Sequence, residues 1–174
     1  MRSFIARSAV VFGCLFLFSF GALAQTGVYA TFSASDFTIP NVSWQYGPTF
    51  GIYHDFFRFP FIGAGLDARA TLAGFSASEI YSGFAGPTIQ LHPAILPFKP
   101  YAEVLVGAGN VKVGQGVAAT NQTAFSYEGV VGLDWTILPQ IDWRVIDFSY
   151  QKFTNLSIRA TPRTVSTGIV LRLP

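Results

Sequence analysis

Seven charged side chains share one feature: each falls on the polar side of a segment that alternates between polar and apolar residues. They are Asp67, Arg69, Glu103, Glu128, Asp134, Arg144 and Arg172. Paired carboxylates can perform acid–base chemistry when their surroundings differ. Here the acids are spread singly among three arginines, and an unpaired buried charge is costly, so opposite charges enclosed together are expected to pair. The pattern therefore predicts a structural network of ion pairs and no catalytic group.

Little else in the chain has the residue types for chemistry. The two histidines, His54 and His92, have no candidate nucleophile nearby, and His54-Asp55 is the only adjacent pair of a histidine and an acid. A metal site needs several ligands at defined spacing, which the scattered acids do not provide. Gly63-x-Gly65 and Gly107-x-Gly109 lie within alternating segments without a following helix, so they are not nucleotide loops. We expect these glycines to relieve crowding beside larger side chains, and we expect no metal or cofactor.

The stretch 124–138, AFSYEGVVGLDWTIL, shows the alternation best. One face carries Phe125, Tyr127, Gly129, Val131, Leu133, Trp135 and Ile137, and the other carries Ser126, Glu128, Val130, Gly132, Asp134 and Thr136. Successive side chains of a strand point to opposite faces, so this segment has one apolar and one partly charged wall. The alternation runs over 125–137, about 13 residues, which exceeds the usual five or six of a strand. Such a length is typical of a tilted strand that crosses a bilayer with its apolar face toward lipid.

Eight segments repeat this pattern and account for nearly all of the chain after residue 24. They are 27–34, 43–53, 61–73, 80–91, 100–113, 124–138, 141–153 and 164–173. Their spacing suits antiparallel strands joined by turns. Pro87 cannot donate to a strand ladder, so a bulge or break is expected there. The adjacent apolar residues Val145 and Ile146 mark a change of phase and predict a β-bulge. The sequence thus predicts one all-β domain, an eight-stranded antiparallel up-and-down barrel.

Two eight-stranded architectures fit this count. A soluble, lipocalin-like barrel keeps apolar residues inside around a ligand, whereas an outer-membrane barrel turns them outward. The apolar faces carry almost no charge, while the seven charged residues share the opposite faces. An arginine facing lipid at the bilayer midplane would cost about 2–4 kcal/mol. An eight-stranded interior also has little room for many aromatic rings. These arguments favour a transmembrane barrel with a polar lumen over an exported binder of apolar ligands.

Composition and the first residues agree with this interpretation. Charged residues make up 11% of the chain and hydrophobic residues 51%, whereas ordinary domains carry roughly 25% charged residues. Arg2 and Arg7 precede an apolar run, and Ala22-Leu23-Ala24 follows it, a pattern typical of a cleavable secretory signal peptide over residues 1–24. The remaining segment, 25–174, has no cysteine and nine bases against nine acids. Without clustered positive charge, no nucleic-acid partner is expected.

The signal peptide, the eight alternating segments and the run DWRVIDFSYQKF (142–153) together resemble the small, OmpA/OmpX-like outer-membrane β-barrel proteins of bacteria. The resemblance implies location in the outer membrane of a Gram-negative-type bacterium, insertion by the outer-membrane assembly machinery and a lumen filled with side chains. One feature departs from this class, whose members typically end in an aromatic residue. This chain ends in Leu173-Pro174.

In such a barrel, the links 35–42, 74–79, 114–123 and 154–163 would face outside, and they are rich in small polar residues. The links 54–60, 92–99 and 139–140 would face the periplasm, and aromatic residues in the first two predict an interfacial girdle. Lys152, Arg159 and Arg163 lie where they can contact lipopolysaccharide phosphates. We therefore expect a non-enzymatic barrel with a structural or surface-interaction role, in contact with outer-membrane lipid and lipopolysaccharide. A pore for small solutes or protons is the alternative.

Overall fold

The computed structural model describes residues 25–36, 44–75, 78–93, 95–113, 120–154 and 161–173. Eight strands make up nearly all of these residues. They are β1 (Gln25–Asp36), β2 (Gln45–Arg58), β3 (Ile62–Phe75), β4 (Ser78–Leu91), β5 (Phe98–Val113), β6 (Thr120–Leu138), β7 (Ile141–Phe153) and β8 (Arg163–Leu173). Within the described ranges no helix is long and apolar enough to span a membrane.

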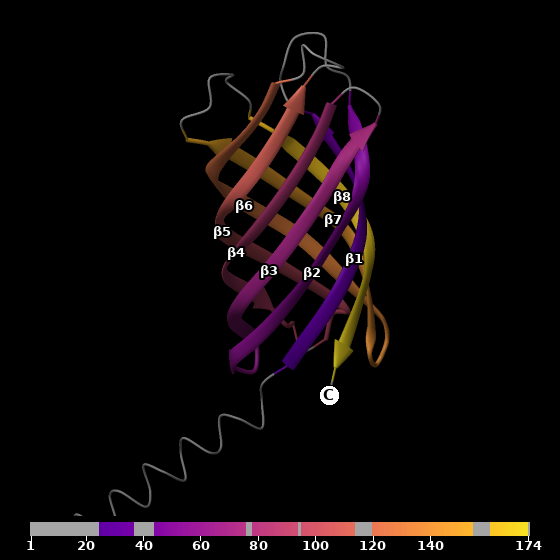
Figure 1. The fold of residues 1–174 in the computed structure, drawn as a ribbon. Coiled ribbons are helices and arrows are strands. Elements are labelled where there is room, and N and C mark those ends of the chain that lie inside the picture. The colour runs from indigo at the N-terminus through magenta and orange to yellow at the C-terminus, as the bar shows by residue number, and fades with distance from the viewer. Residues whose placement is uncertain are drawn as a thin grey trace, which may run out of the picture.

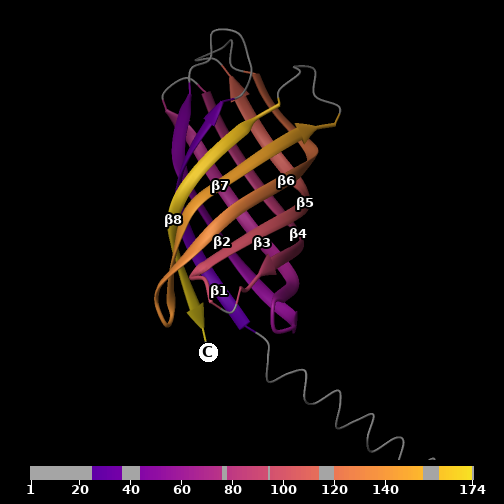
Figure 2. The ribbon, with the colours of Figure 1, turned by 180° about the vertical axis from the view of Figure 1, so that it is seen from behind.

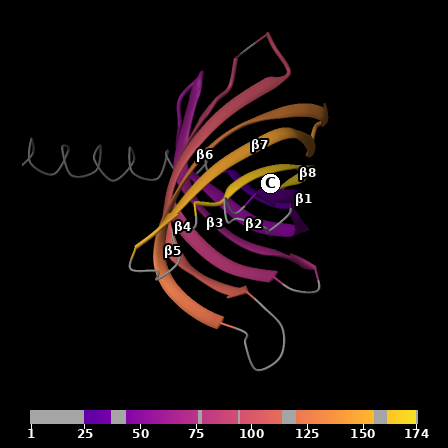
Figure 3. The same ribbon diagram turned by 90° about the horizontal axis from the view of Figure 1, so that it is seen from above.

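The strands form a closed barrel in chain order, each antiparallel to its neighbours (Figures 1 and 2). Closure comes from β1, which pairs with β8 from Thr26 opposite Leu173 to Asp36 opposite Arg163. Viewed from above, the strands follow one another around a central axis (Figure 3). The predicted eight-stranded antiparallel barrel is confirmed. We call the end of the barrel that holds Gln25 and Leu173 the terminal end, and the opposite end the loop end (Figure 1).

The predicted alternation is present along the strands. In β6, Ser126, Glu128 and Asp134 are buried, whereas Phe125 and Val131 are exposed. Several strands are longer than the sequence pattern indicated. The strand β2 continues to Arg58 and includes most of the predicted link 54–60, because the ladder to β3 shifts register between Asp55 and Phe57. Residues 54–60 were predicted to form a link, and that prediction was wrong for residues 54–58.

The predicted bulge in β7 is confirmed. Leu133 pairs with Ile146 and Asp134 with Arg144, so Val145 has no partner in β6. The extra residue restores the inward direction of the following polar side chains, and Arg144 and Asp147 are both buried as a result. At Pro87 the ladder to β5 is interrupted but resumes in the same register, while the ladder to β3 continues through it. The proline therefore causes a local break and not a bulge.

An apolar belt covers the outside of the barrel. Every strand contributes large apolar side chains, which are 44 to 65% exposed in the following examples: Phe32, Phe50, Leu66, Ile89, Val104, Val131, Ile146 and Ile169. Aromatic rings flank this belt at both ends. Phe56, Phe57, Phe59, Phe61, Trp135 and Trp143 lie toward the terminal end, and Tyr46, Tyr81, Tyr127 and Tyr150 toward the loop end. Monomeric soluble proteins rarely expose apolar surface on this scale.

Candidate functional site: the ionic interior of the barrel

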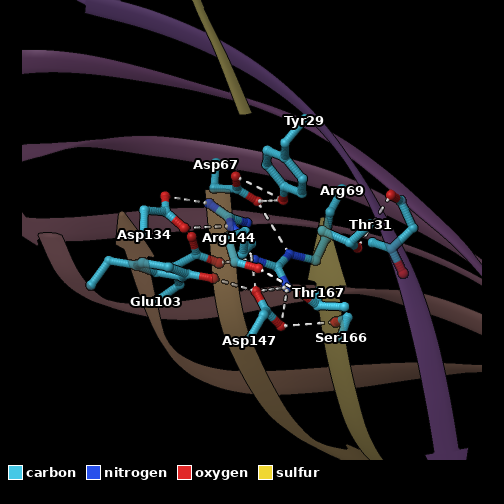
Figure 4. Close-up of polar contacts among 12 residues, drawn as sticks. Tyr29, Thr31, Asp67, Arg69, Glu103, Asp134, Arg144, Asp147, Ser166 and Thr167 are labelled. Carbon is cyan, nitrogen blue, oxygen red and sulfur yellow. Dashed lines mark hydrogen bonds and ion pairs between the residues drawn. The ribbon is translucent and has the colours of Figure 1, made fainter. Parts of the chain in front are cut away.

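Arg69 of β3 is one of two arginines at the centre of the barrel (Figure 4). Its Nε lies 3.3 Å from Asp67 Oδ1, its Nη1 lies 3.3 Å from Asp147 Oδ2, and its Nη2 pairs with Glu103 Oε2. The partners come from β3, β5 and β7, so this one guanidinium connects different sides of the barrel wall. All four side chains are almost completely buried.

Arg144 of β7 is the second arginine. Its Nε donates to Asp134 Oδ1 at 3.0 Å and its Nη2 to Asp134 Oδ2 at 3.3 Å, a two-pronged pair. Its Nη1 lies 3.5 Å from Asp147 Oδ2, the carboxylate that also pairs with Arg69. Asp147 therefore joins the two arginines into a single unit.

Two tyrosines enclose the Arg144 guanidinium. Its carbon lies 4.1 Å from the ring centre of Tyr29 and 4.4 Å from that of Tyr101, within cation–π range. The Tyr29 hydroxyl donates to Asp67 at 3.0 Å, and the Tyr101 hydroxyl donates to Asp147 Oδ2 at 2.6 Å. Both rings thus contact Arg144 and hydrogen-bond to a carboxylate that pairs with Arg69, and the Tyr29 ring centre also lies 5.6 Å from the guanidinium carbon of Arg69. We call this set the ionic cluster: Tyr29, Asp67, Arg69, Tyr101, Glu103, Asp134, Arg144 and Asp147.

Glycines give these rings their space. Tyr29 pairs across strands with Gly51, and Tyr101 with Gly132. A Cβ atom added at Gly51 would lie 2.2 Å from Tyr29 Cζ, and one at Gly132 would lie 2.3 Å from Tyr101 Cζ. Any larger residue would displace the rings from Arg144. Of the glycines predicted to relieve crowding, Gly63 and Gly109 lie against side chains, whereas Gly65 and Gly107 lie against neighbouring backbone.

A separate ion-paired group lies toward the terminal end. Asp142 pairs with Lys99 Nζ at 2.9 Å and with Arg172 Nη2 at 3.0 Å. Nearby, His92 follows β4, and neither of its ring nitrogens has a hydrogen-bond partner. Burial, together with the cations Arg58, Lys99 and Arg172, lowers the pKa of His92 to about 4. The imidazole is therefore neutral near pH 7.

Toward the loop end, the interior is lined by hydroxyl and amide groups. Thr49 Oγ1 lies 2.7 Å from Ser33 Oγ and 2.9 Å from Thr71 Oγ1. Ser35 Oγ contacts Thr164 Oγ1 at 2.8 Å, and Gln151 Nε2 donates to Ser126 Oγ at 3.2 Å. We call this set the hydroxyl layer: Ser33, Ser35, Thr49, Thr71, Ser126, Gln151 and Thr164. It holds the loop-end strands together through short, mostly neutral contacts.

No protein-family model and no curated protein matches the chain. Solved structures do match it. Neisserial surface protein A has a TM-score of 0.61 at 14% identity, with 85% of this chain and 96% of that chain covered. Ail, the attachment invasion locus protein of Yersinia pestis, has a TM-score of 0.56 at 18% identity, with 86% and 97% covered. The outer membrane protein OprG of Pseudomonas aeruginosa has a TM-score of 0.58 at 11% identity, with 86% and 96% covered.

The chain has the fold of the small outer-membrane β-barrels. The strand count, the antiparallel closure and the coverage of nearly the whole of each matched chain support this together. At these identities the likeness concerns the fold, and the roles of particular residues depend on their own geometry in this barrel.

Within this outer-membrane barrel fold, five of the seven charged residues singled out in the sequence lie together. Asp67, Arg69, Glu103, Asp134 and Arg144 are all members of the ionic cluster. Arg172 instead pairs with Asp142 toward the terminal end. Glu128 is buried near the hydroxyl layer and forms no ion pair with a described residue.

Four important interior residues were absent from the sequence-based set. Asp147 joins the two arginines, Asp142 pairs with Lys99, and Tyr29 and Tyr101 enclose Arg144. Asp142 lies two residues before Arg144 and shares its face by ordinary alternation, and the phase change at 145–146 places Asp147 on that face as well, so both had a usable signal. An aromatic residue on a polar face, with glycine opposite, would have indicated the tyrosines.

The remaining sequence candidates lie elsewhere. Lys152 and Arg163 are exposed near the loop end, where Lys152 pairs across strands with Tyr127 and Arg163 with Tyr150. Arg159 lies outside the described residues. His54 is part of β2 and not of a link, and its Nδ1 contacts Thr26 Oγ1 at 2.8 Å. In the described ranges, no three His, Cys, Asp or Glu side chains are grouped to hold a metal ion.

Proposed function

We propose that this chain is a non-enzymatic outer-membrane barrel, closed by its own side chains, with a structural or surface-interaction role. One observation carries the proposal: the wall is apolar on the outside and ionic on the inside. This arrangement suits a hydrocarbon surrounding and would be unfavourable in water. Residues 1–24 would direct export, the assembly machinery would insert the barrel, and the terminal end would face the periplasm.

Closure of the lumen is supported by the ionic cluster. Its side chains reach inward from β1, β3, β5, β6 and β7 and contact one another across the barrel axis (Figure 4). Eight-stranded barrels have interiors just wide enough to be filled by side chains. A solute path would require Arg69, Arg144 and their four carboxylates to separate, which is costly for buried ions.

Heat modifiability tests the membrane assignment. Cells that express the full chain are fractionated, and boiled and unboiled samples are compared on a denaturing gel. We expect a band in the outer-membrane fraction that shifts on boiling, because a closed barrel resists detergent until heated. A soluble periplasmic band without a shift would contradict the proposal and favour a lipocalin-like binder.

Planar-bilayer recording separates the closed barrel from a pore. The purified, refolded barrel should give no steady conductance steps, because the ionic cluster fills the cross-section. Steady open steps from the wild-type protein would replace this part of the proposal with a small-solute or ion pore, while leaving the membrane assignment intact.

Lipopolysaccharide is the surface partner that the loop end supports best. Lys152 and Arg163 each lie beside a tyrosine, Tyr127 and Tyr150, on the outer face of neighbouring strands. Cations at this level can pair with phosphates while the tyrosine rings occupy the interface.

The test replaces Lys152, Arg159 and Arg163 with alanine and measures lipopolysaccharide binding to the refolded barrel. A basic residue near an anionic lipid surface contributes about 1 kcal/mol, roughly a fivefold change in affinity for each cation. Arg58→Ala removes a cation from the terminal end and serves as the matched control, with no change expected. Unchanged binding in the triple variant would rule out this contact.

A further inference from the structure

Buried acids outnumber bases in the middle of the barrel. The ionic cluster holds four carboxylates and two arginines, and Glu128 of β6 adds a fifth carboxylate beside it. Each carboxylate of the cluster forms an ion pair with Arg69 or Arg144, whereas Glu128 forms none with a described residue. The Glu128 residue is 5% exposed. A buried carboxylate without a counter-charge is costly, so its charge must be balanced or removed.

Arg69 is the described cation that acts most strongly on Glu128, and its charge is already balanced. Three carboxylates form ion pairs with its guanidinium: Asp67, Glu103 and Asp147. Asp67 and Asp147 also repel a negative charge on Glu128. An ionised Glu128 would therefore be a fourth negative charge around one positive charge, and Arg69 does not neutralise it.

The other neighbours of Glu128 are neutral. Leu105 of β5 and Gln151 of β7 lie opposite it in the two adjoining ladders, and the Gln151 amide donates to Ser126. Ser149 of β7 provides one hydroxyl contact, while Glu128 Oε2 has no partner. About two or three hydrogen bonds are needed to hold a buried carboxyl group in its charged form. The surroundings of Glu128 thus favour its neutral form.

We propose that Glu128 holds a proton in the folded barrel at neutral pH and is the proton-binding site of its interior. A protonated carboxyl group is neutral and gains an O–H donor, which can hydrogen-bond to the hydroxyl of Ser149. The bound proton removes a charge that no described base balances. It also connects β6 to β7 through a neutral contact between the ionic cluster and the hydroxyl layer.

The proton makes the folded barrel more stable in acid than in alkali. In the unfolded chain Glu128 is an ordinary glutamate, which releases its proton above about pH 4.3. The folded barrel keeps that proton, so at neutral pH it binds one proton more than the unfolded chain. Because a ligand held by the folded state alone stabilises that state, this contribution is complete in acid and is lost as the pH rises.

Urea unfolding of the refolded barrel in lipid vesicles tests the site. Glu128→Gln keeps the shape of the side chain and is neutral in both states, so it removes this one proton from the linkage. Between about pH 5 and pH 7, the unfolding constant of the wild type divided by that of Glu128→Gln should rise about tenfold for each pH unit. A ratio that does not change with pH would overturn the proposal.

Asp36→Asn is the matched control for this titration. It removes a partly exposed acid at the end of β1 and should keep the pH dependence of the wild type. If Asp36→Asn abolished that dependence as completely as Glu128→Gln, the effect would not belong to Glu128 and the proposal would be wrong.

Nuclear magnetic resonance of the wild type gives a second test that needs no variant. The chain has three glutamates, Glu79, Glu103 and Glu128, so a ¹³C label at glutamate Cδ gives three carboxyl signals, each assigned through its own backbone. At neutral pH the Glu128 signal should have the chemical shift of a carboxylic acid. A carboxylate shift for Glu128, or an acid shift confined to Glu103, would overturn the proposal.

Discussion

The ionic cluster and the hydroxyl layer fill the same barrel in different ways. In the ionic cluster, two arginines share four carboxylates, and Asp147 serves both arginines. In the hydroxyl layer, contacts join neutral groups, for example Ser33 to Thr49 and Ser35 to Thr164. The cluster lies deep in the barrel and the layer toward the loop end, and both are mostly buried, so the difference between them is one of charge.

This difference predicts how the two regions respond to the loss of one side chain. Removing one partner of a buried ion pair leaves a charge without compensation and typically costs about 3–5 kcal/mol. Removing one partner of a neutral hydrogen bond costs about 0.5–1.5 kcal/mol. Closure of the lumen should therefore depend on a few residues of the cluster and much less on any single hydroxyl.

Arg144→Met should cause the largest loss. Asp134 pairs with no other described cation, so the substitution leaves it buried and unpaired, while Asp147 keeps Arg69. We expect the free energy of unfolding in lipid vesicles to fall by about 3–5 kcal/mol, measured by urea titration. Adding Asp134→Asn should recover part of that loss, because the stranded charge is then removed.

Arg172→Met is the matched control for this prediction. It removes an arginine with an ion pair, but Asp142 keeps Lys99, and Arg172 lies at the partly accessible terminal end. We expect a loss of at most about 1 kcal/mol. If the two variants lost equal free energy of unfolding, the ionic cluster would be no more sensitive to the loss of an arginine than the ion pairs at the terminal end.

Gly51→Ala should have the next largest effect, because it acts on the cluster through packing. The new Cβ would lie 2.2 Å from Tyr29 Cζ and force the ring off Arg144. We expect a loss of about 1–3 kcal/mol, the usual cost of overpacking. Gly129→Ala is the control: it faces outward with nothing within 4 Å of an added Cβ, so its unfolding midpoint should stay unchanged. If Gly51→Ala left the free energy of unfolding unchanged, the contact between the Tyr29 ring and Arg144 would not contribute to stability.

The sequence predicted the two faces of the wall well, because a strand has a fixed period of two and both walls have strongly biased composition. It predicted strand ends less well. Two adjacent aromatics, Phe56 and Phe57, interrupt the alternation, and the structure has a register shift within β2 where a link over 54–60 was predicted.

The contacts inside the barrel were less accessible to prediction from sequence. Alternation places Arg69 and Asp147 inside, but β3 and β7 are not neighbours in the sheet. Their contact depends on tilt and stagger around the whole barrel, which no local pattern encodes.

Thr49→Val should have the smallest effect and tests the hydroxyl layer directly. It removes the hydroxyl that contacts both Ser33 and Thr71 while keeping the shape of the side chain. We expect a loss of about 1 kcal/mol in the urea titration, because the lost contacts are between neutral groups and a hydroxyl can rotate toward another acceptor. Adding Thr71→Val should lower the free energy of unfolding little further, because it removes one of the two hydroxyls that lost their contact with Thr49. If Thr49→Val instead lowered the free energy of unfolding as much as Arg144→Met, the hydroxyl layer and the ionic cluster would be equally sensitive to the loss of one side chain. The proposed difference between charged and neutral interiors would then be wrong.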